Sequence, residues 1–224
     1  MKKILLNNVV ILFTKRKGQK NIRLTKNGAG EIVLSAPFFC SEKKAFEFAQ
    51  KNIEWIEKHS IKDNKLLFKP LDVISIVGKE YQIIHDSSHK SGLKISNNQL
   101  ITGADESFIH RRVVNYAKKE LLAYIKQKIN IFSPLIDKKP KNIFLKNTTS
   151  RWGSCSSNGN INFCWKIAFA PTFVIDYLIA HELSHLKEMN HSSKFWETVA
   201  LFNVNQAEAE IWLRKNGNKL IQIN

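Results

Sequence analysis

The sequence predicts an α+β protein, with a β-rich N-terminal region over residues 1–104 and a mixed region over residues 105–224. Short β-prone runs separated by turn residues fill most of the first region. Longer stretches with apolar residues at helical spacing dominate the second. The 43% hydrophobic content of the 224 residues suffices for one sizeable core or two small ones. Because no flexible linker marks residue 104, a single compact unit is the alternative to this division.

The first region contains predicted hairpins and a single predicted helix over residues 41–60, which Ser41 is suited to cap. KNGAGE, and the Gly-Lys and Asn-Asn pairs in the last two runs, have the composition of hairpin turns. The predicted β-prone runs are VVILFTK, NIRLTK, EIVLSA, VISIVGKEYQII and GLKISNNQLIT.

The second region begins with a long helix predicted from Asp105, because acidic residues favour the start of a helix. It is expected to end before Pro134, since proline interrupts helical hydrogen bonding. An extended run, NIFLKNTTSRW, then turns through SSNGN into a second run, INFCWKIAF. Pro171 marks the start of the next helix, and Ser192 is suited to cap another.

The helix predicted after Pro171 carries the residues of a metal site. His181 and His185 lie four positions apart, which places both imidazoles on one face with roughly 6 Å between their Cβ atoms. Glu182 is rotated by about 100° and can accept a proton from a water on the ion. This HExxH arrangement predicts one zinc ion with Glu182 as general base.

A catalytic zinc usually takes three protein ligands, and the third is expected just beyond this helix. Asn190 is suited to a left-handed, helix-ending conformation, and His191 follows it directly. His191 is therefore the predicted third ligand. The acidic alternatives to it are Glu197, Glu208 and Glu210.

The composition favours a cytoplasmic protein. Three cysteines without CxxC spacing suit a reducing compartment better than a disulfide framework. The start, MKKILLNNVVILF, is similar to a secretory signal, but two asparagines interrupt it and a basic segment replaces the cleavage site. No apolar run approaches the roughly 20 residues of a membrane span, so no membrane partner is expected.

The net charge of +16 suggests nucleic acid as a partner. Residues 1–70 carry 15 basic and 6 acidic residues, whereas residues 143–224, with the histidines, carry 8 and 6. Only six of the 35 basic residues are arginine, whose guanidinium can bind phosphate through two hydrogen bonds at once. A compositional bias toward lysine, asparagine and isoleucine is the favoured explanation, because basic composition alone does not define a site.

The chain resembles the YgjP-like family of zinc metallopeptidases, which is related to the WLM and SprT-like proteases. The motifs RWGSC, APTFVIDYLIAHELSHL and NHSSKFW carry the resemblance, which extends over nearly the whole chain. It implies a zincin-like core, in which a small antiparallel or mixed sheet packs on the HExxH helix. It also implies His181, His185 and His191 as zinc ligands and Glu182 as general base.

The resemblance gives RWGSC a place beside the metal, on the strand where zincins bind an extended substrate by strand addition. Gly153 would then let a substrate backbone approach closely, and Arg151 would offer charge to a developing oxyanion. The alternatives are a structural ion pair for Arg151 and core packing for Trp152, of which the latter is favoured.

The predicted function is hydrolysis of peptide bonds in a peptide or protein substrate by zinc-activated water. Metal-dependent hydrolysis of nucleotide phosphoanhydrides is one alternative, although a Walker-type glycine loop is missing and HExxH has few of the oxygen ligands that Mg²⁺ prefers. A nucleic-acid-associated protease of the SprT-like type is another. The sequence does not predict the oligomeric state.

Overall fold

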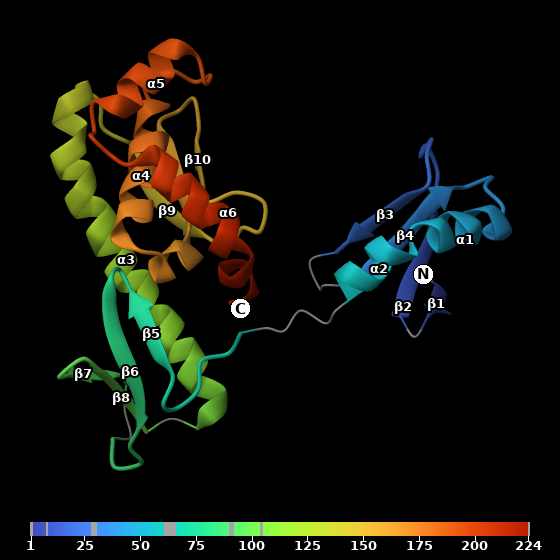
Figure 1. Ribbon diagram of the computed structural model, residues 1–224, viewed down its shortest axis with the longest axis horizontal. Helices are drawn as coiled ribbons and strands as arrows, with labels where there is room; N and C mark the ends of the chain where they lie inside the picture. Colours follow the sequence, from blue (N-terminus) through green and yellow to red (C-terminus); the bar gives the residue numbers. More distant parts are fainter. Residues whose placement is uncertain are drawn as a thin grey trace. The chain divides into compact units, whose positions relative to one another are not determined.

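The computed structural model describes residues 2–7, 9–27, 31–60, 66–89, 92–103 and 105–223. The chain forms two compact units, Met1–Lys65 and Leu66–Asn224, which are both drawn in Figure 1. Each unit contains helices and strands, so the predicted α+β class is confirmed. Among the described helices, none combines the length and the apolar character that crossing a membrane requires.

The first unit contains a four-stranded sheet in the order β1-β2-β4-β3, with the inner pair parallel and the outer pairs antiparallel. The three predicted strands are confirmed. The described residues of the signal-like run at the start of the chain form β1 and the first part of β2, which pair with each other. The predicted turn KNGAGE falls largely on residues 28–30, outside the described residues. The strands are β1 (Lys2–Leu6), β2 (Val9–Arg16), β3 (Arg23–Lys26) and β4 (Ile32–Pro37).

Two helices, α1 (Glu42–Lys51) and α2 (Ile53–Ser60), replace the single predicted helix. The break lies at Asn52, whose side-chain amide donates to a carbonyl one turn back at 2.8 Å and so ends α1. Ser41 caps α1 as predicted, because its hydroxyl accepts from the backbone N–H of Lys44. α1 packs on β4, α2 packs on β2 and β4, and together they bury the apolar core of this unit.

The second unit begins with a sheet of the same topology, in the order β5-β6-β8-β7. Both predicted hairpins are confirmed. Asn97 and Asn98 form the second turn with φ of 47° and 59°, while the first turn lies at Val77 and Gly78, one residue earlier than predicted. The strands are β5 (Val73–Ile76), β6 (Lys79–His85), β7 (Lys94–Ser96) and β8 (Gln99–Thr102).

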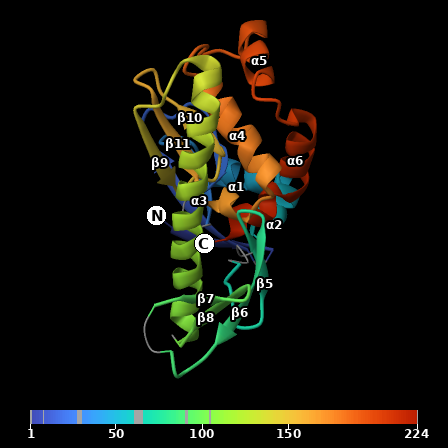
Figure 2. The same ribbon diagram turned by 90° about the vertical axis from the view of Figure 1, so that its left-hand side faces the viewer.

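Helix α3 (Glu106–Ile136) runs along this sheet and along the elements that follow it in the chain (Figure 2). The prediction that it ends before Pro134 is wrong. A proline near the end of a helix removes only one late hydrogen bond, and the helix stops instead at Asp137, which is left-handed with φ of 50°. The buried face of α3 is apolar and fully covered, with Ile109, Val113, Leu121 and Ile125 at 0% exposure.

A three-stranded mixed sheet follows, in the order β10-β11-β9, so that β10 lies at its edge. β11 pairs antiparallel with β10 and parallel with β9. The predicted return run INFCWKIAF is a strand only as far as Cys164 and continues as the 3₁₀ helix η1. The elements are β9 (Asn142–Lys146), β10 (Gly153–Cys155), β11 (Asn160–Cys164) and η1 (Trp165–Phe169).

Three helices complete the unit: α4 (Thr172–Ser184), α5 (Ser193–Ala200) and α6 (Gln206–Gln222). Pro171 precedes the first turn of α4, as predicted, because a helix start leaves backbone N–H groups unpaired in any case. α4 packs against α3, α5, α6 and β10. The expected small mixed sheet packed on the HExxH helix is therefore present.

The division between the units lies at residues 65 and 66, whereas the sequence places it near residue 104. Tyr81, Ile83 and Leu100 of the β5–β8 sheet belong to the same buried core as α3 and α4. The apolar face of this sheet is removed from water by packing against α3. This burial is favourable, and it makes the sheet part of the second unit. Residue 104 itself is outside the described residues.

Gly78 fixes the start of α4 against the first hairpin of the second unit. An added Cβ at Gly78 would lie 2.8 Å from Thr172 Cγ2, whereas one at Gly92 would meet nothing within 4 Å. Both glycines have positive φ, 73° and 70°, so alanine strains both backbones alike. We expect Gly78→Ala to lower the free energy of unfolding by about 1–3 kcal/mol more than Gly92→Ala, measured by denaturant titration. Equal losses would contradict this packing.

Candidate metal centre and adjoining cleft

Helix α4 is apolar on nearly every side, because it lies between the mixed sheet and three other helices. A helix with this pattern is a buried core helix. His181, Glu182 and His185 are therefore polar groups held in apolar surroundings. The α4 residues with 0% exposure are Val174, Ile175, Ile179, Ala180, Leu183 and Ser184.

The imidazoles of His181, His185 and His191 converge at the C-terminal end of α4. One ring nitrogen from each lies within 4.8 Å of the other two, a spacing that could hold a metal ion. His181 Nε2 and His191 Nε2 are 3.2 Å apart. Two nitrogens bound tetrahedrally at 2.0–2.1 Å from one zinc ion are separated by about 3.3 Å, so the observed spacing fits.

The turn that brings His191 back to α4 is not left-handed at Asn190, and that expectation is wrong. The Asn190 side-chain carbonyl instead accepts from the backbone N–H of Ser192 at 3.3 Å, which tightens the bend before α5. The Glu188 carbonyl accepts from His185 Nδ1 at 3.1 Å. That bond leaves His185 Nε2 as the free ring nitrogen, the arrangement common in metal-binding histidines.

Phe195 of α5 supports all three imidazoles and was missed in the sequence. Its fully buried ring lies 5.0, 4.6 and 4.7 Å, centroid to centroid, from His181, His185 and His191. Trp196 stacks on His191 at 5.8 Å. The only indication of this role in the sequence was the pair of aromatic residues that follows Ser192. Ordinary core packing would explain that pair equally well.

The protonation of the histidines suits metal binding. Burial, followed by the neighbouring His185 and His191, lowers the pKa of His181 to about 4. Burial also lowers the pKa of His185, against the effect of its bond to the Glu188 carbonyl. Both rings are therefore neutral at pH 7, which is the form that binds a metal ion.

Glu182 lies beside the histidines and packs directly onto the backbone of β10. Its side chain is 4% exposed, and one carboxyl oxygen, Oε2, has no hydrogen-bond partner among the described residues. A Cβ at Gly153 would overlap Glu182 Oε1 and lie 2.7 Å from its Cγ and Cδ. Gly153 thus makes room for this carboxyl, and the expected approach of a substrate backbone at this residue stays a prediction.

Burial raises the pKa of Glu182 to about 8, although the charge of Arg151 acts in the opposite direction. A divalent cation beside the carboxyl would favour its ionised form. The neighbouring Cys155 is a free thiol whose pKa is raised to about 11, by burial and then by the charge of Glu182. Cys155 is therefore protonated at neutral pH and is not a competing nucleophile.

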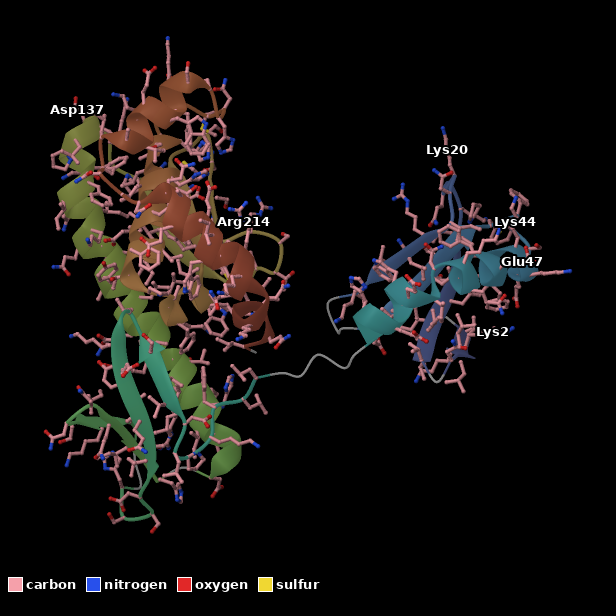
Figure 3. All side chains as sticks on the ribbon, viewed as in Figure 1. Lys2, Lys20, Lys44, Glu47, Asp137 and Arg214 are labelled. Carbon is pink, nitrogen blue, oxygen red and sulfur yellow. The ribbon has the colours of Figure 1, made fainter. Side chains whose placement is uncertain are left out.

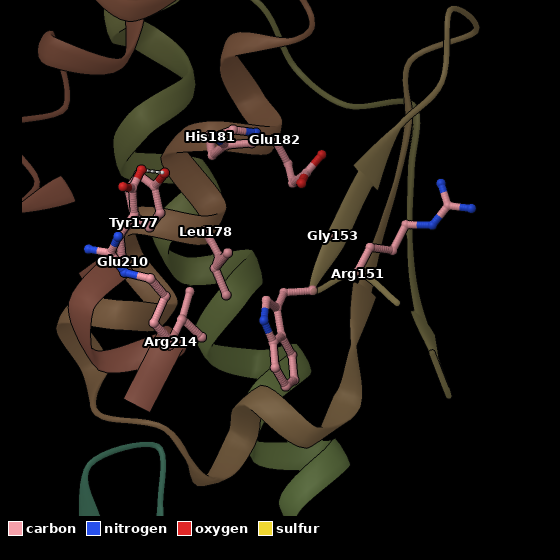
Figure 4. A pocket seen from close by; sticks show the side chains of 10 residues that line it. Arg151, Gly153, Tyr177, Leu178, His181, Glu182, Glu210 and Arg214 are labelled. Atoms are coloured by element: carbon pink, nitrogen blue, oxygen red, sulfur yellow. Dashed lines mark hydrogen bonds between the residues drawn. The ribbon is translucent and has the colours of Figure 1, made fainter. Parts of the chain in front are cut away.

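A cleft of about 390 Å³ opens between β10, α4 and α6 and reaches His181 and Glu182 (Figure 4). Apolar side chains of Trp152, Leu178 and Leu213 line part of it. Trp152 also packs against Gly217 of α6 and the main core, so the favoured packing role is supported.

Tyr177 and Glu210 form the polar wall of this cleft. The Tyr177 hydroxyl donates to Glu210 Oε1 at 2.9 Å (Figure 4). The Gln206 amide donates to the same oxygen at 2.9 Å. These two bonds lower the pKa of Glu210. Burial, followed by the bond to Glu210, raises the pKa of Tyr177. Tyr177 lies one turn before His181, and this spacing could have indicated that it lies beside the metal centre. A tyrosine at such a position in an apolar helix can equally be a core residue.

The acidic alternatives to His191 are not in the cluster of possible metal-binding groups among the described residues. Glu210 lines the cleft but is bonded to Tyr177, and Glu208 is bonded to the Asn205 cap of α6. Glu197 on α5 is exposed.

Arg151 lines the cleft next to Gly153, with an exposed side chain whose guanidinium points away from His181 and Glu182 in Figure 4. No ion pair of this side chain occurs within the described part of the chain. Its predicted part in catalysis therefore depends on its charge or on a different side-chain rotamer, and stays a prediction.

Two solved structures are similar to part of the chain. The metallopeptidase zymogen of Pyrococcus abyssi abylysin has 20% identity and a TM-score of 0.37 over 45% of this chain and 97% of its own. The metallopeptidase zymogen of Methanocaldococcus jannaschii jannalysin has 24% identity and a TM-score of 0.36 over 43% of this chain and 97% of its own. A comparison with curated proteins gives no match.

An HExxH helix beside a small mixed sheet, with three converging imidazoles, is the arrangement of a metallopeptidase. The model of the YgjP-like family, described as the YgjP-like metallopeptidase domain, matches residues 20–216. The chain belongs to this family and is a hydrolase of the metallopeptidase class.

The exposed His191 provides a test of the metal centre that does not require a substrate. We expect His191→Ala to weaken zinc binding at least about tenfold, because only two nitrogens of the cluster remain. His85→Ala, an exposed histidine of β6 outside the cluster, should retain one zinc ion per chain. Competition with a chromogenic chelator measures both; equal affinity in the two variants would exclude the cluster as the site.

Proposed function

We propose that this protein is a zinc-dependent peptidase, in which His181, His185 and His191 hold one zinc ion and Glu182 is the general base. The observation that carries this proposal is the convergence of three imidazoles beside a buried carboxyl with an unpartnered oxygen. The family match to a metallopeptidase domain supports it. The neutral state of the half-buried His181 and His185 also supports it, since a divalent ion requires unprotonated nitrogens.

Zinc, when bound, acts as a Lewis acid that lowers the pKa of its water and polarises a substrate carbonyl. Glu182 Oε2 is free to take the proton of the attacking water and to deliver it to the departing amine. A pKa raised by burial makes this carboxylate a stronger base than one in water. The carboxyl lies against the backbone of β10, in the space that a side chain on residue 153 would occupy.

We further propose that an extended peptide binds along β10. This strand pairs with β11 on one side, and no described strand pairs with its other side. The backbone of an edge strand can hydrogen-bond an added strand, and the neighbouring cleft can then take a substrate side chain. Because Glu182 covers one face of Gly153, the substrate would approach from the edge of the sheet.

Arg151 contributes to this mechanism, in our proposal, through its charge. The guanidinium lowers the pKa of Glu182 and so favours the ionised base. A rotation of its exposed side chain toward the cleft would bring the same charge near a developing oxyanion.

Glu182→Gln is expected to abolish peptide hydrolysis, by about 10²-fold or more, while leaving zinc binding intact. The amide keeps the shape of the side chain but cannot accept a proton. Turnover of a fluorogenic peptide library and zinc content are measured on the same preparation, with Glu197→Gln as the matched control on α5. Full activity of Glu182→Gln, or release of phosphate from nucleotides in place of peptide cleavage, would refute the mechanism.

Gly153→Ala tests the contact between β10 and the general base. We expect it to reduce kcat by about 10²-fold with zinc retained, because the new methyl displaces the Glu182 carboxyl. Gly92→Ala should keep the wild-type kcat in spite of its strained backbone, since its Cβ would lie in open space. Wild-type kcat in Gly153→Ala would show that the carboxyl is not held by this contact.

A further inference from the structure

The first unit is much more basic than the second. Residues 1–65 contain 14 basic and 6 acidic residues, and residues 66–224 contain 21 and 13. Each part therefore has a net charge of +8, although the first is less than half as long. The first 30 residues include eight basic residues and no acidic one. The charge is thus concentrated in the unit that does not carry the histidine cluster.

The topology of the sheet brings part of this charge next to exposed aromatic rings. β2 and β4 run parallel, and their ends meet where Arg16 lies opposite Pro37. Phe38 and Phe39 follow directly and are 48% and 95% exposed. Lys17, which follows β2, lies over the Phe38 ring with its Nζ 5.7 Å from the centroid.

A hollow of about 650 Å³ lies at this end of the unit, between the loop before β3 and the start of α1. Lys20 and Lys44 supply its charge, Phe39 and Phe48 its aromatic surface, and no acidic residue lines it. Figure 3 shows the labelled Lys20 and Lys44 side chains extending outward from the ribbon of this unit. Neither lysine forms an ion pair with a described residue.

Several acidic residues of the unit are already engaged elsewhere. Glu42 forms an ion pair with Lys2 at 2.9 Å, and the Asn27 amide donates to Glu31 at 2.9 Å. These contacts leave the lysines of the hollow without compensating charge from either carboxylate. A hollow lined by lysines and by no acidic residue attracts an anionic partner.

We propose that this hollow binds single-stranded nucleic acid, with Lys17, Lys20 and Lys44 on the phosphates and Phe39 stacked on a base. A ring that is 95% exposed beside lysines has the two elements by which proteins hold single strands, a stacking platform and a cationic groove. Bases in a duplex are not available for such stacking.

Fluorescence anisotropy of a labelled oligothymidylate of about 15 nucleotides tests the proposal on the full chain. Lys20→Glu with Lys44→Glu should weaken binding by at least about tenfold at 0.1 M salt and reduce the dependence of affinity on salt. The matched control, Lys26→Glu with Lys51→Glu, makes the same change of net charge away from the hollow and should bind within about twofold of wild type. Phe39→Ala should weaken binding severalfold without loss of stability, because its ring is exposed.

Several results would overturn the proposal: no binding by the wild-type protein, equal loss in the two double variants, or tighter binding of a duplex of the same length. Binding to vesicles rich in phosphatidylserine but not to the oligonucleotide would assign the surface to membranes instead. Peptide hydrolysis, measured in parallel, should be unchanged in all these variants. The experiment therefore succeeds or fails independently of the proposed peptidase mechanism.

Discussion

The contact between α4 and β10 is the constraint on which the metal centre depends. Glu182 can be buried at this position only because residue 153 has no side chain. The same packing turns His181 toward the bend after α4, where His191 meets it at 3.2 Å. A carboxyl and an imidazole that are adjacent in sequence thus reach different sides of one site, because successive residues on a helix are rotated by about 100°.

This contact is unfavourable for stability when considered alone. An unpartnered polar atom in a buried position costs about 1–3 kcal/mol, and both Glu182 Oε2 and His181 Nδ1 are such atoms among the described residues. The remainder of α4 offsets the cost, because its apolar residues are fully covered by α3, α6 and the mixed sheet. A core helix that retains polar groups at this cost has the pattern expected of a functional site.

The sequence predicted the parts of the site that are local, because spacing on a single helix determines which side chains share a face. The same holds for the hairpins, whose turn at Asn97 and Asn98 follows from residues that tolerate positive φ. Contacts between distant segments were not predictable. Phe195 beneath the histidines, and Glu182 over Gly153, depend on how α5 and β10 pack, and composition carries no signal of that packing. The packing of the β5–β8 sheet against α3 was not predictable for the same reason. The composition changes near residue 104, but the segments on either side of it share one core.

The two units differ in how their polar groups are arranged, and this difference separates two kinds of chemistry. In the second unit the reactive groups are few, neutral or buried, and held by packing, as proton transfer and metal binding require. In the first unit the charges are numerous, exposed and on long side chains, which suits attraction over a distance and tolerates many geometries. A net charge of +16 calculated for the whole chain conceals this division. Half of that charge belongs to a 65-residue unit that contributes no residue to the histidine cluster, so the basic composition and the metal centre have separate physical causes.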